Sequence, residues 1–461
     1  MPTPNPTTRV LHTAHRLLLA AALLLSLVGC AALDPQHVVT RHMGYAPPED
    51  SAPMDADTRQ QAVDFVWNRI NEAYVNPQLN GVNWKQVRDQ QEASILSAAN
   101  DDIFWKKLDT MVAELGDSHT RVLSPPQFAN DQKKQSSTVG LSAAPLGDNI
   151  VVLAVAKDSA AEKAGIVKGN KLLTIDGTTA TDWWRFQSQK ARKNSTERAR
   201  QKTVKRMLNS GDPEAPSNTL VLGLERNDAT RVQATLTRSV LKRPDNLSSK
   251  ILPNGYGYMR LTGFDLRLMF EVASAFDTIK NTPSLVIDLR GNGGGALKLA
   301  THMMEYLVQG KVALGKKVTR SGRPPRLFMG LFDVGTMELQ LNGVKAPYLA
   351  PVAVLVDADS ASASEFFASA LQGIGRAQVV GEISCGCLLG YLGYANVPGG
   401  GALAYSELDF APLHGKRIEG TGVVPDHRIS PSRQDLIDGK DPVLALAIQV
   451  LDTRLPRSAT P

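Results

Sequence analysis

Short apolar runs alternate with stretches of helical periodicity from residue 255 onward, and this alternation constrains the fold more than any other feature of the chain. Strands separated by helices pair in parallel, and helices then cover both faces of the sheet. The predicted strands are 257–261, 284–289, 351–356 and 378–380, and the predicted helices between them are 267–278, 297–308 and the segment after Ser362. The fold class is therefore α/β, with a layered core.

The length of 461 residues suggests two or three domains. Helical periodicity at 57–74 and 103–115 predicts an N-terminal helical region over 56–135. We expect a β domain over 136–240, the α/β core over 241–431, and a C-terminal helix and tail over 432–461. The segments 183–215 and 315–348 remain unassigned.

The first thirty residues predict export and a lipid anchor. Basic residues precede an apolar run, Leu17 to Val28, that is too short to span a bilayer comfortably. The run ends in Gly29-Cys30, which resembles the lipobox of bacterial lipoproteins, in which the cysteine is diacylated after the signal peptide (1–29) is removed. Acyl chains bind membranes by burying methylenes. A plain secretory signal that contains a cysteine is the alternative.

The segment 30–55 lacks periodicity and is expected to be a tether between the membrane and the fold. Ala31 and Ala32 follow the cysteine, with no Asp beside it. By the sorting preference of such lipoproteins in Gram-negative bacteria, this implies the periplasmic face of the outer membrane.

Charge and cysteine content narrow the function classes. The net charge of +6 is modest, and no zinc-ligand spacing or phosphate loop occurs, so a nucleic-acid role has little support. The densest basic stretch, 190–206, is expected to be a solvated helix face, with a partner-binding patch as the alternative. Cys385 and Cys387 could form a tight disulfide ring, a dithiol or a metal-binding pair, and stay unassigned.

A serine-rich run is the first candidate for chemistry. Three serines, Ser360, Ser362 and Ser364, follow an apolar strand and open a helix. A hydroxyl at a helix N-terminus has its anionic form favoured by the helix dipole. Serine is also a preferred N-cap, so this run alone does not establish a nucleophile.

A glycine-rich turn is the second candidate. The apolar strand 285–289 runs into Gly291-Asn292-Gly293-Gly294-Gly295. Glycines permit positive φ and expose successive N–H groups, which can bind an anion. In acyl transfer such a nest is an oxyanion hole, and in other proteins it holds phosphate. The spacing of a phosphate-binding loop is absent here.

Five ordered motifs resemble the S41 serine peptidases, the tail-specific or C-terminal processing peptidases and their tricorn-core relatives. The motifs are Leu115-Gly116-Asp117-Ser118-His119-Thr120, Asp288-Leu289-Arg290-Gly291-Asn292-Gly293-Gly294-Gly295, Ser360-Ala361-Ser362-Ala363-Ser364-Glu365, Val380-Gly381-Glu382 and Glu419-Gly420-Thr421-Gly422-Val423-Val424-Pro425-Asp426. The resemblance implies a peptidase core of the ClpP/crotonase-like α/β kind, and Ser362 as its nucleophile.

The β domain resembles a circularly permuted bacterial PDZ domain. The matching pieces are Val139-Gly140-Leu141 and the run from Ala164 to Gly177. PDZ domains add an extended peptide to a sheet edge, and backbone N–H groups of the loop take its C-terminal carboxylate. The resemblance therefore implies that the loop 139–141 binds a substrate tail.

Two branches of the family use different general bases, and the chain matches only one of them. Processing peptidases use a lysine after a glycine, but here Cys387 follows Gly386, and an assisting Asp position holds Gly373. The tricorn-like branch uses a histidine from a Ser-His pair and a distant glutamate, which match Ser118-His119 and Glu419. The other histidines lie in the signal, the tether, a helix or C-terminal loops. A neutral imidazole suits the role of base.

The resemblance thus implies a serine endopeptidase of the cell envelope that cleaves near protein C-termini through an acyl-enzyme. His119 accepts the proton of Ser362, and Ser118 and Glu419 orient or polarise the assembly. Ala363, with Gly294 or Gly295, supplies the oxyanion hole. We expect a protein or peptide substrate and membrane contact through Cys30. An adaptor protein is a further candidate partner, and no metal or organic cofactor is expected.

Two alternatives stay open. A catalytically inactive lipoprotein could keep the fold and the PDZ-like domain as a binding scaffold, which Cys387 and Gly373 motivate. A carboxylesterase would share the acyl chemistry, but the chain lacks a Gly-x-Ser-x-Gly elbow.

Overall fold

The computed structural model describes residues 53–133, 135–211, 217–242, 246–327, 332–333 and 335–455. The predicted signal peptide, Cys30 and nearly all of the tether lie outside these ranges. No helix within them is long and apolar enough to cross a membrane.

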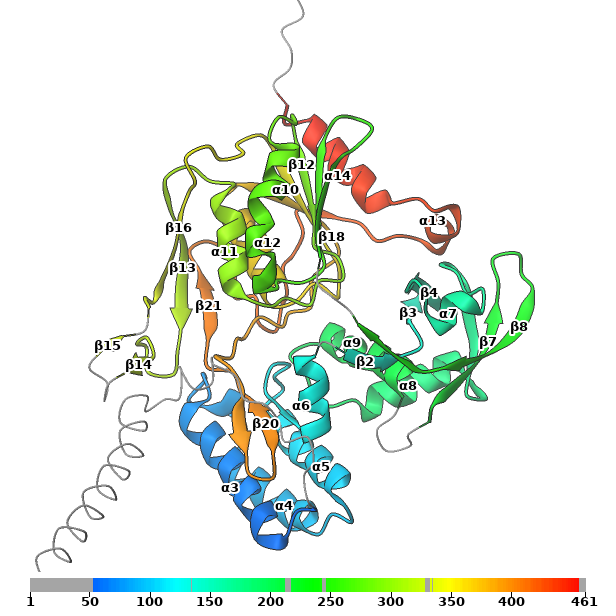
Figure 1. Ribbon diagram of the computed structural model, residues 1–461, viewed down its shortest axis with the longest axis vertical. Coiled ribbons are helices and arrows are strands. Elements are labelled where there is room, and N and C mark those ends of the chain that lie inside the picture. The colour runs from blue at the N-terminus through cyan, green and yellow to red at the C-terminus, as the bar shows by residue number, and fades with distance from the viewer. Residues whose placement is uncertain are drawn as a thin grey trace, which may run out of the picture.

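A six-stranded sheet forms the centre of the molecule (Figure 1). Its first pair is antiparallel and every later pair is parallel, which confirms the parallel pairing expected from the alternation. In spatial order the strands are β10 (Leu247–Ile251), β11 (Gly257–Leu261), β12 (Leu285–Asp288), β17 (Val352–Val356), β18 (Ala377–Gly381) and β22 (His427–Arg428).

Helices cover both faces of this sheet because its strands are apolar on both sides. Leu285 and Ile287 pack into the cluster that includes α10, α11 and α12, whereas Val286 between them packs against α14. These helices are α10 (Val272–Ile279), α11 (Leu297–Glu305), α12 (Ala363–Gly373) and α14 (Pro442–Asp452). The helix predicted at 267–278 is divided, because a 3₁₀ turn, η2 (Leu266–Phe270), precedes α10.

The N-terminal helices share their core with a hairpin from the far end of the chain. Phe104 and Leu108 pack in one cluster with Val397 and Leu403, and the hairpin pairs with β1. The elements are α3 (Ala56–Ala73), η1 (Leu79–Gly81), α4 (Trp84–Leu96), α5 (Asp101–Ala113), β1 (Arg121–Leu123), α6 (Pro125–Gln132), β19 (Ala395–Val397) and β20 (Gly401–Ala404). The sequence expectation missed α4, which buries only Trp84 and Ile95 and so has a weak apolar stripe.

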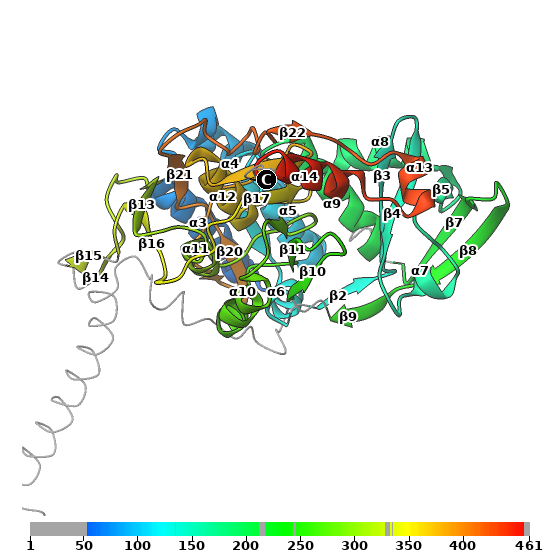
Figure 2. The same ribbon diagram turned by 90° about the horizontal axis from the view of Figure 1, so that it is seen from above.

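The β domain projects to one side of the core (Figures 1 and 2). Its antiparallel sheet has the order β3-β4-β5-β7-β8, and a two-stranded ribbon, β2-β9, lies at its junction with the core. The strands are β2 (Gln135–Thr138), β3 (Leu141–Leu146), β4 (Asn149–Val155), β5 (Lys171–Ile175), β6 (Thr178–Thr179), β7 (Thr219–Glu225), β8 (Arg231–Thr237) and β9 (Ser239–Lys242). Its helices are α7 (Ala160–Lys163), α8 (Ala180–Lys190) and α9 (Glu197–Ser210), and the last two occupy most of the unassigned 183–215.

The unassigned segment 315–348 contributes to a small sheet beside the core. Its order is β16-β13-β21, from β16 (Glu338–Asn342), β13 (Lys311–Val318) and β21 (Asp409–Pro412). A two-residue pair, β14 (Arg326–Leu327) and β15 (Phe332–Asp333), and the helix α13 (Arg433–Asp438) complete the described elements.

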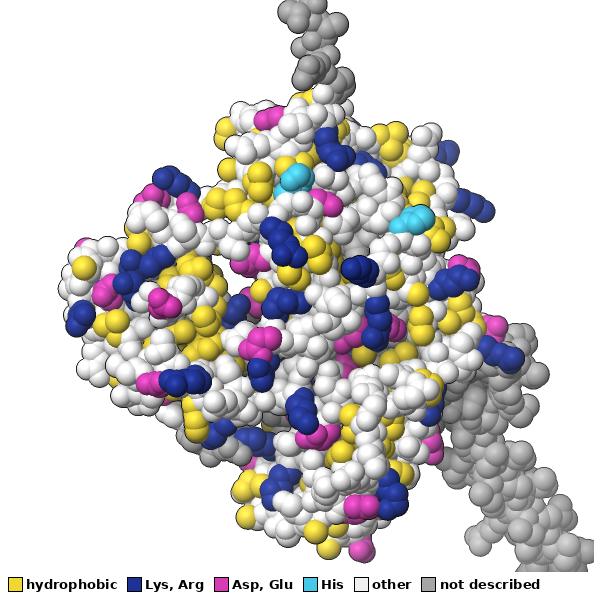
Figure 3. Space-filling model, turned by 180° about the vertical axis from the view of Figure 1, so that it is seen from behind, with side chains coloured by type: hydrophobic (Ala, Val, Ile, Leu, Met, Phe, Trp, Pro, Cys, Tyr) yellow, Lys and Arg dark blue, Asp and Glu magenta, His cyan; other side chains and the backbone are white. Residues whose placement is uncertain are grey.

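Surface charge is mixed on the face shown in Figure 3. Lys and Arg side chains lie there with Asp and Glu between them, rather than in one basic stripe. This face gives no electrostatic footprint of the kind that nucleic-acid binding requires.

Candidate active site

Ser362 stands at the turn between β17 and α12 in a strained backbone conformation. Its φ of 55° and ψ of −118° lie outside the regions that L-residues favour. The N–H of Ser362 donates to the Cys387 carbonyl at 2.9 Å and to Glu365 Oε2 at 3.0 Å. A residue held in this conformation by its surroundings points to a functional role.

The other two serines of the run have structural partners. Ser360 Oγ donates to the Leu289 carbonyl and Ser364 Oγ to the Asn292 carbonyl, each at 2.9 Å. Both side chains are fully buried, whereas Ser362 is partly exposed. The turn at 357–364, between β17 and the start of α12, is called the nucleophile turn below. Its outer serines bond it to the glycine turn, and its middle serine stays accessible.

The glycine turn packs against Ser362. A Cβ on Gly294, whose φ is +99°, would lie 2.6 Å from the Ser362 Cβ and 2.9 Å from the Ala363 nitrogen, so only glycine fits. The Gly294 N–H donates to Asn292 Oδ1 at 2.9 Å and is therefore engaged. Among the described residues, the N–H groups of Gly293 and Ala363 have no acceptor. Gly293 is a donor that the sequence expectation did not include.

Gly295, the other expected donor, lies against a neighbouring loop. A Cβ on this residue would lie 2.4 Å from the Phe264 carbonyl oxygen. Gly295 therefore permits close approach of the two backbones, and its part in an oxyanion hole stays a prediction.

Glu365 is a buried carboxylate that sequence reasoning did not assign. It accepts hydrogen bonds from Ser384 Oγ at 2.6 Å and from the N–H groups of Gly386 at 2.6 Å and Cys387 at 2.9 Å, besides that from Ser362. Burial raises the pKa of Glu365, and these hydrogen bonds act against the increase. Glu365 therefore ties the nucleophile turn to the loop of Cys385 and Cys387.

His119 is partly buried and has an unpaired ring nitrogen. Its backbone N–H donates to Asp117 Oδ1 at 2.7 Å, while the buried ring atom Nδ1 has no hydrogen-bond partner. Burial lowers the pKa of His119 to about 4, and the nearby Asp117 carboxylate opposes this. The imidazole is therefore neutral at neutral pH, the state that a general base needs. No hydrogen bond among the described residues joins His119 to Ser362.

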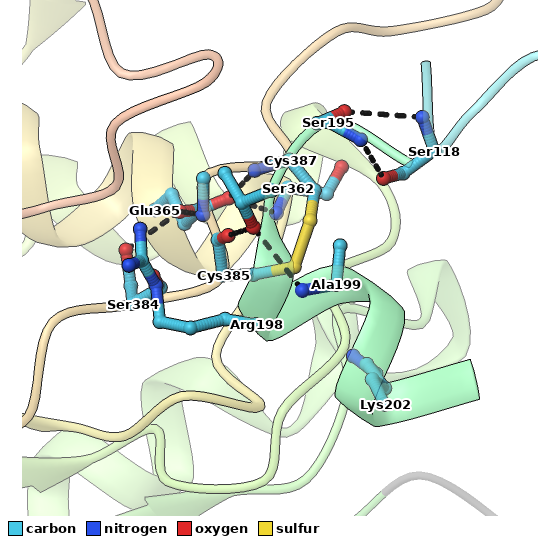
Figure 4. Close-up of a disulfide and its surroundings, with 12 residues drawn as sticks. Ser118, Ser195, Arg198, Ala199, Lys202, Ser362, Glu365, Ser384, Cys385 and Cys387 are labelled. Carbon is cyan, nitrogen blue, oxygen red and sulfur yellow. Dashed lines mark hydrogen bonds between the residues drawn. A yellow bond between two sulfur atoms is a disulfide. The ribbon is translucent and has the colours of Figure 1, made fainter. Parts of the chain in front are cut away.

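Ser118 lies beside Ser195, a residue that the motifs did not indicate. The two serines exchange two hydrogen bonds of 3.1 Å (Figure 4), and the nearby Ser195 side chain acts to lower the pKa of Glu419. Glu419 also accepts from the N–H groups of Leu388 and Leu389. Burial, aided by Asp117, raises the pKa of Glu419 to about 7.

Two models of known protein families match parts of the chain. The model of peptidase family S41 matches residues 255–429, which include the glycine turn, Ser362 and Glu419, and the model of the tricorn protease C1 domain matches residues 55–113. Together with the relatives below, these matches identify the protein as a serine-type peptidase.

Relatives of this peptidase include two processing enzymes. The chloroplastic C-terminal processing peptidase of Tetradesmus obliquus is 28% identical over 397 residues, which cover 82% of this chain and 79% of that one. The carboxyl-terminal-processing protease of a Picosynechococcus strain is 28% identical over 373 residues, covering 78% and 81%.

Solved structures share the fold. The photosystem II D1 C-terminal processing protease has a TM-score of 0.52 at 23% identity and covers 81% of this chain and 93% of its own. Mature CPAF in complex with lactacystin has a TM-score of 0.64 at 15% identity, with 86% and 99% covered.

In this peptidase, α9 lies directly over the nucleophile turn. Arg198 Nε donates to the Ser384 carbonyl at 2.5 Å, and Lys202 Nζ donates to the Asp359 carbonyl at 2.9 Å. Lys205 forms an ion pair of 2.7 Å with Asp359. The expectation that 190–206 is a solvated basic face is wrong for these three side chains. Burial lowers the pKa of Lys202.

The loop 139–141, expected to bind a substrate tail, already has hydrogen-bond partners, and one of them is Asn209 of α9. The Leu141 N–H donates to Asn209 Oδ1 at 2.8 Å, and the Gly140 N–H donates to Thr138 Oγ1 at 3.0 Å. The Val139 carbonyl accepts from the Ala161 N–H at 3.0 Å. An amide oxygen of Asn209 therefore stands where a carboxylate oxygen would be bound.

Proposed function

We propose that the protein is a serine endopeptidase that cleaves protein substrates near their C-termini through an acyl-enzyme. The observation that carries the proposal is the position of Ser362, partly exposed at a positive φ, beside Gly294 and the open N–H of Ala363. The relatives are C-terminal and carboxyl-terminal processing peptidases, which supports cleavage near C-termini. The test is labelling of Ser362 by a fluorophosphonate, described in the Discussion.

In the proposed mechanism, His119 accepts the proton of Ser362 as its Oγ attacks the scissile carbonyl. The Ala363 N–H and a donor of the glycine turn stabilise the negative charge on the carbonyl oxygen. His119 then returns the proton to the leaving amine, and water hydrolyses the acyl-enzyme in a second cycle. Ser118, which is hydrogen-bonded to Ser195, and Glu419 orient the assembly. For this chemistry His119 must approach Ser362, since no hydrogen bond joins them in the structure described.

Tail recognition by 139–141 is part of the proposal, and Asn209 is the residue that tests it. Asn209→Ala should free the Leu141 N–H for a carboxylate and strengthen binding of a peptide with a free C-terminus about fivefold, since one hydrogen bond contributes about 1 kcal/mol. Calorimetry with a free-acid peptide and its C-terminal amide measures the effect, and the amide should gain nothing.

Asn227→Ala is the matched control, because Asn227 bonds to Asn170 and the Lys168 carbonyl at the opposite end of the β domain. Equal affinities of the free acid and the amide for wild type and for Asn209→Ala would refute tail capture by this loop.

We also propose that Cys30 is lipidated and anchors the protein to the outer membrane. The lipobox-like sequence supports this. In a Gram-negative host, Cys30→Ser should move the protein from the membrane fraction to the soluble periplasmic fraction and abolish incorporation of labelled palmitate. Membrane association and palmitate incorporation at wild-type levels in Cys30→Ser would contradict the anchor.

A further inference from the structure

Cys385 and Cys387 form a disulfide that the proposed mechanism does not use. The two cysteines are two positions apart, with their Cα atoms 5.3 Å apart, and both side chains are buried. They pack in one small cluster with Ala361 of the nucleophile turn and Ala199 of α9, beside Ser362 (Figure 4).

The backbone of this disulfide loop holds the nucleophile turn on both sides of Ala361. The Cys385 N–H donates to the Ser360 carbonyl at 2.9 Å, and the Cys387 carbonyl accepts from the Ser362 N–H at 2.9 Å. A bridge over a single intervening residue restricts the backbone of all three residues, so it keeps these two bonds in fixed relative positions.

The same loop also organises the carboxylates of the site. The N–H groups of Gly386 and Cys387 donate to Glu365, and the Gly386 carbonyl accepts from the N–H of Gly420, which follows Glu419. Displacement of the loop would therefore move the oxyanion donor next to Ser362 and the loop of Glu419 together.

The helix α9 shields the disulfide. Thr196 Oγ1 donates to the Cys385 carbonyl at 2.5 Å, and Ala199 covers the sulfurs. Arg198 reinforces this cover by donating to the Ser384 and Thr421 carbonyls. A reductant therefore reaches the sulfur atoms only when α9 moves away from the nucleophile turn.

We propose that the Cys385–Cys387 disulfide is a redox-sensitive positioning element, which keeps Ser362 competent while oxidised and lowers its reactivity when reduced. This inference rests on the proposed function of Ser362. A thiolate of a dithiol attacks one sulfur of the protein disulfide and releases the other as a thiolate. The second thiol of the reagent then attacks its own sulfur in the mixed disulfide, and the remaining protein sulfur leaves as a thiolate. The protein disulfide gains two electrons and two protons and becomes two thiols, while the dithiol is oxidised to a disulfide.

Reduction should slow the chemical step without changing substrate binding. Two free thiols keep their sulfur atoms farther apart than a disulfide does, and both side chains are buried, so we expect the loop to shift. A misplacement of about 1 Å at a reacting group can cost on the order of 100-fold in rate. We therefore expect kcat and the fluorophosphonate labelling rate to fall at least about tenfold, with KM nearly unchanged.

The experiment uses the full chain, oxidised, reduced with dithiothreitol, and reoxidised after removal of the reagent. Alkylation and mass spectrometry count the free thiols in each sample, so that labelling is compared at a known redox state. Oxidised and reoxidised protein should label fast, and reduced protein slowly. The Cys385→Ser/Cys387→Ser double variant should label slowly with or without the reductant, which excludes an effect through Cys30.

The outcomes separate this inference from the proposed function. Absence of labelling in the oxidised protein refutes the nucleophile itself. Equal labelling of oxidised protein and of protein shown to carry free thiols at 385 and 387 overturns the redox proposal alone. A loss that reoxidation does not reverse, with a matching loss of secondary structure by circular dichroism, assigns the disulfide a purely structural role and also overturns it.

Discussion

Replacing Ser362 by alanine should lower kcat for peptide hydrolysis by about 1,000-fold or more and leave substrate affinity close to that of the wild type. Ser362 is the partly exposed serine of its run and abuts the glycine turn and Ala363. The substitution removes only the hydroxyl, because the Ser362 N–H keeps its bonds to Cys387 and Glu365. Steady-state hydrolysis of a fluorogenic peptide, with binding measured separately, checks both expectations.

Ser360→Ala and Ser364→Ala are matched controls in the same turn. Their hydroxyls donate to buried carbonyls, so we expect a loss of stability of about 1–3 kcal/mol and a smaller loss of activity than in Ser362→Ala. If Ser362→Ala kept more than about a tenth of the wild-type kcat, far above the residual rate expected without a nucleophile, Ser362 would not be the nucleophile. If the wild-type protein shows neither labelling nor hydrolysis, the alternative of a catalytically inactive binding protein is favoured.

Removing the imidazole of His119 should also lower kcat by about 1,000-fold or more, if it is the base. The pH profile gives a sharper test. Since burial lowers its pKa to about 4, His119 is already unprotonated above that value and gains a proton only below it. The decrease in kcat/KM that His119 causes at low pH should therefore lie near pH 4 rather than near the ordinary histidine value of about 6.5.

Ionisation of Glu419 should cause a second change in kcat/KM, at higher pH than the change due to His119. Burial raises its pKa to about 7, so the carboxylate forms as the pH rises through that value. If the ionised form orients Ser195 and Ser118, activity rises through the same range. Glu419→Gln, a neutral isostere, should remove the step near pH 7 and keep the one near pH 4. A wild-type profile flat between pH 5 and pH 8 would refute a role for Glu419 ionisation.

Much of the core could be predicted from sequence because its signals are local. The strands β11, β12, β17 and β18 are continuous apolar runs, and each lies within about one residue of its expected range. The nucleophile turn and the glycine turn were both recognised, because each follows such a strand directly.

The features that could not be predicted from the sequence depend on contacts between segments that are far apart in the chain. Ser195 exchanges two hydrogen bonds with Ser118, 77 residues away in the chain, which no local pattern encodes. The hairpin of β19 and β20 completes the N-terminal core although it belongs to the far end of the chain. The basic residues of α9 have the periodicity of a solvated face, but three of them have partners in the core. Lys202 and Lys205 bond to Asp359 of the nucleophile turn, and Arg198 bonds to the Ser384 carbonyl.

Mass-spectrometric mapping of a fluorophosphonate adduct shows directly whether Ser362 is the nucleophile. The wild-type protein, oxidised and at about pH 8, above the pKa values given for His119 and Glu419, is treated with the probe and digested. The account predicts a stoichiometric adduct on Ser362, none in Ser362→Ala, and strongly slowed formation in His119→Ala. An adduct on another serine, or hydrolysis by a protein whose Ser362 stays unmodified, would contradict it.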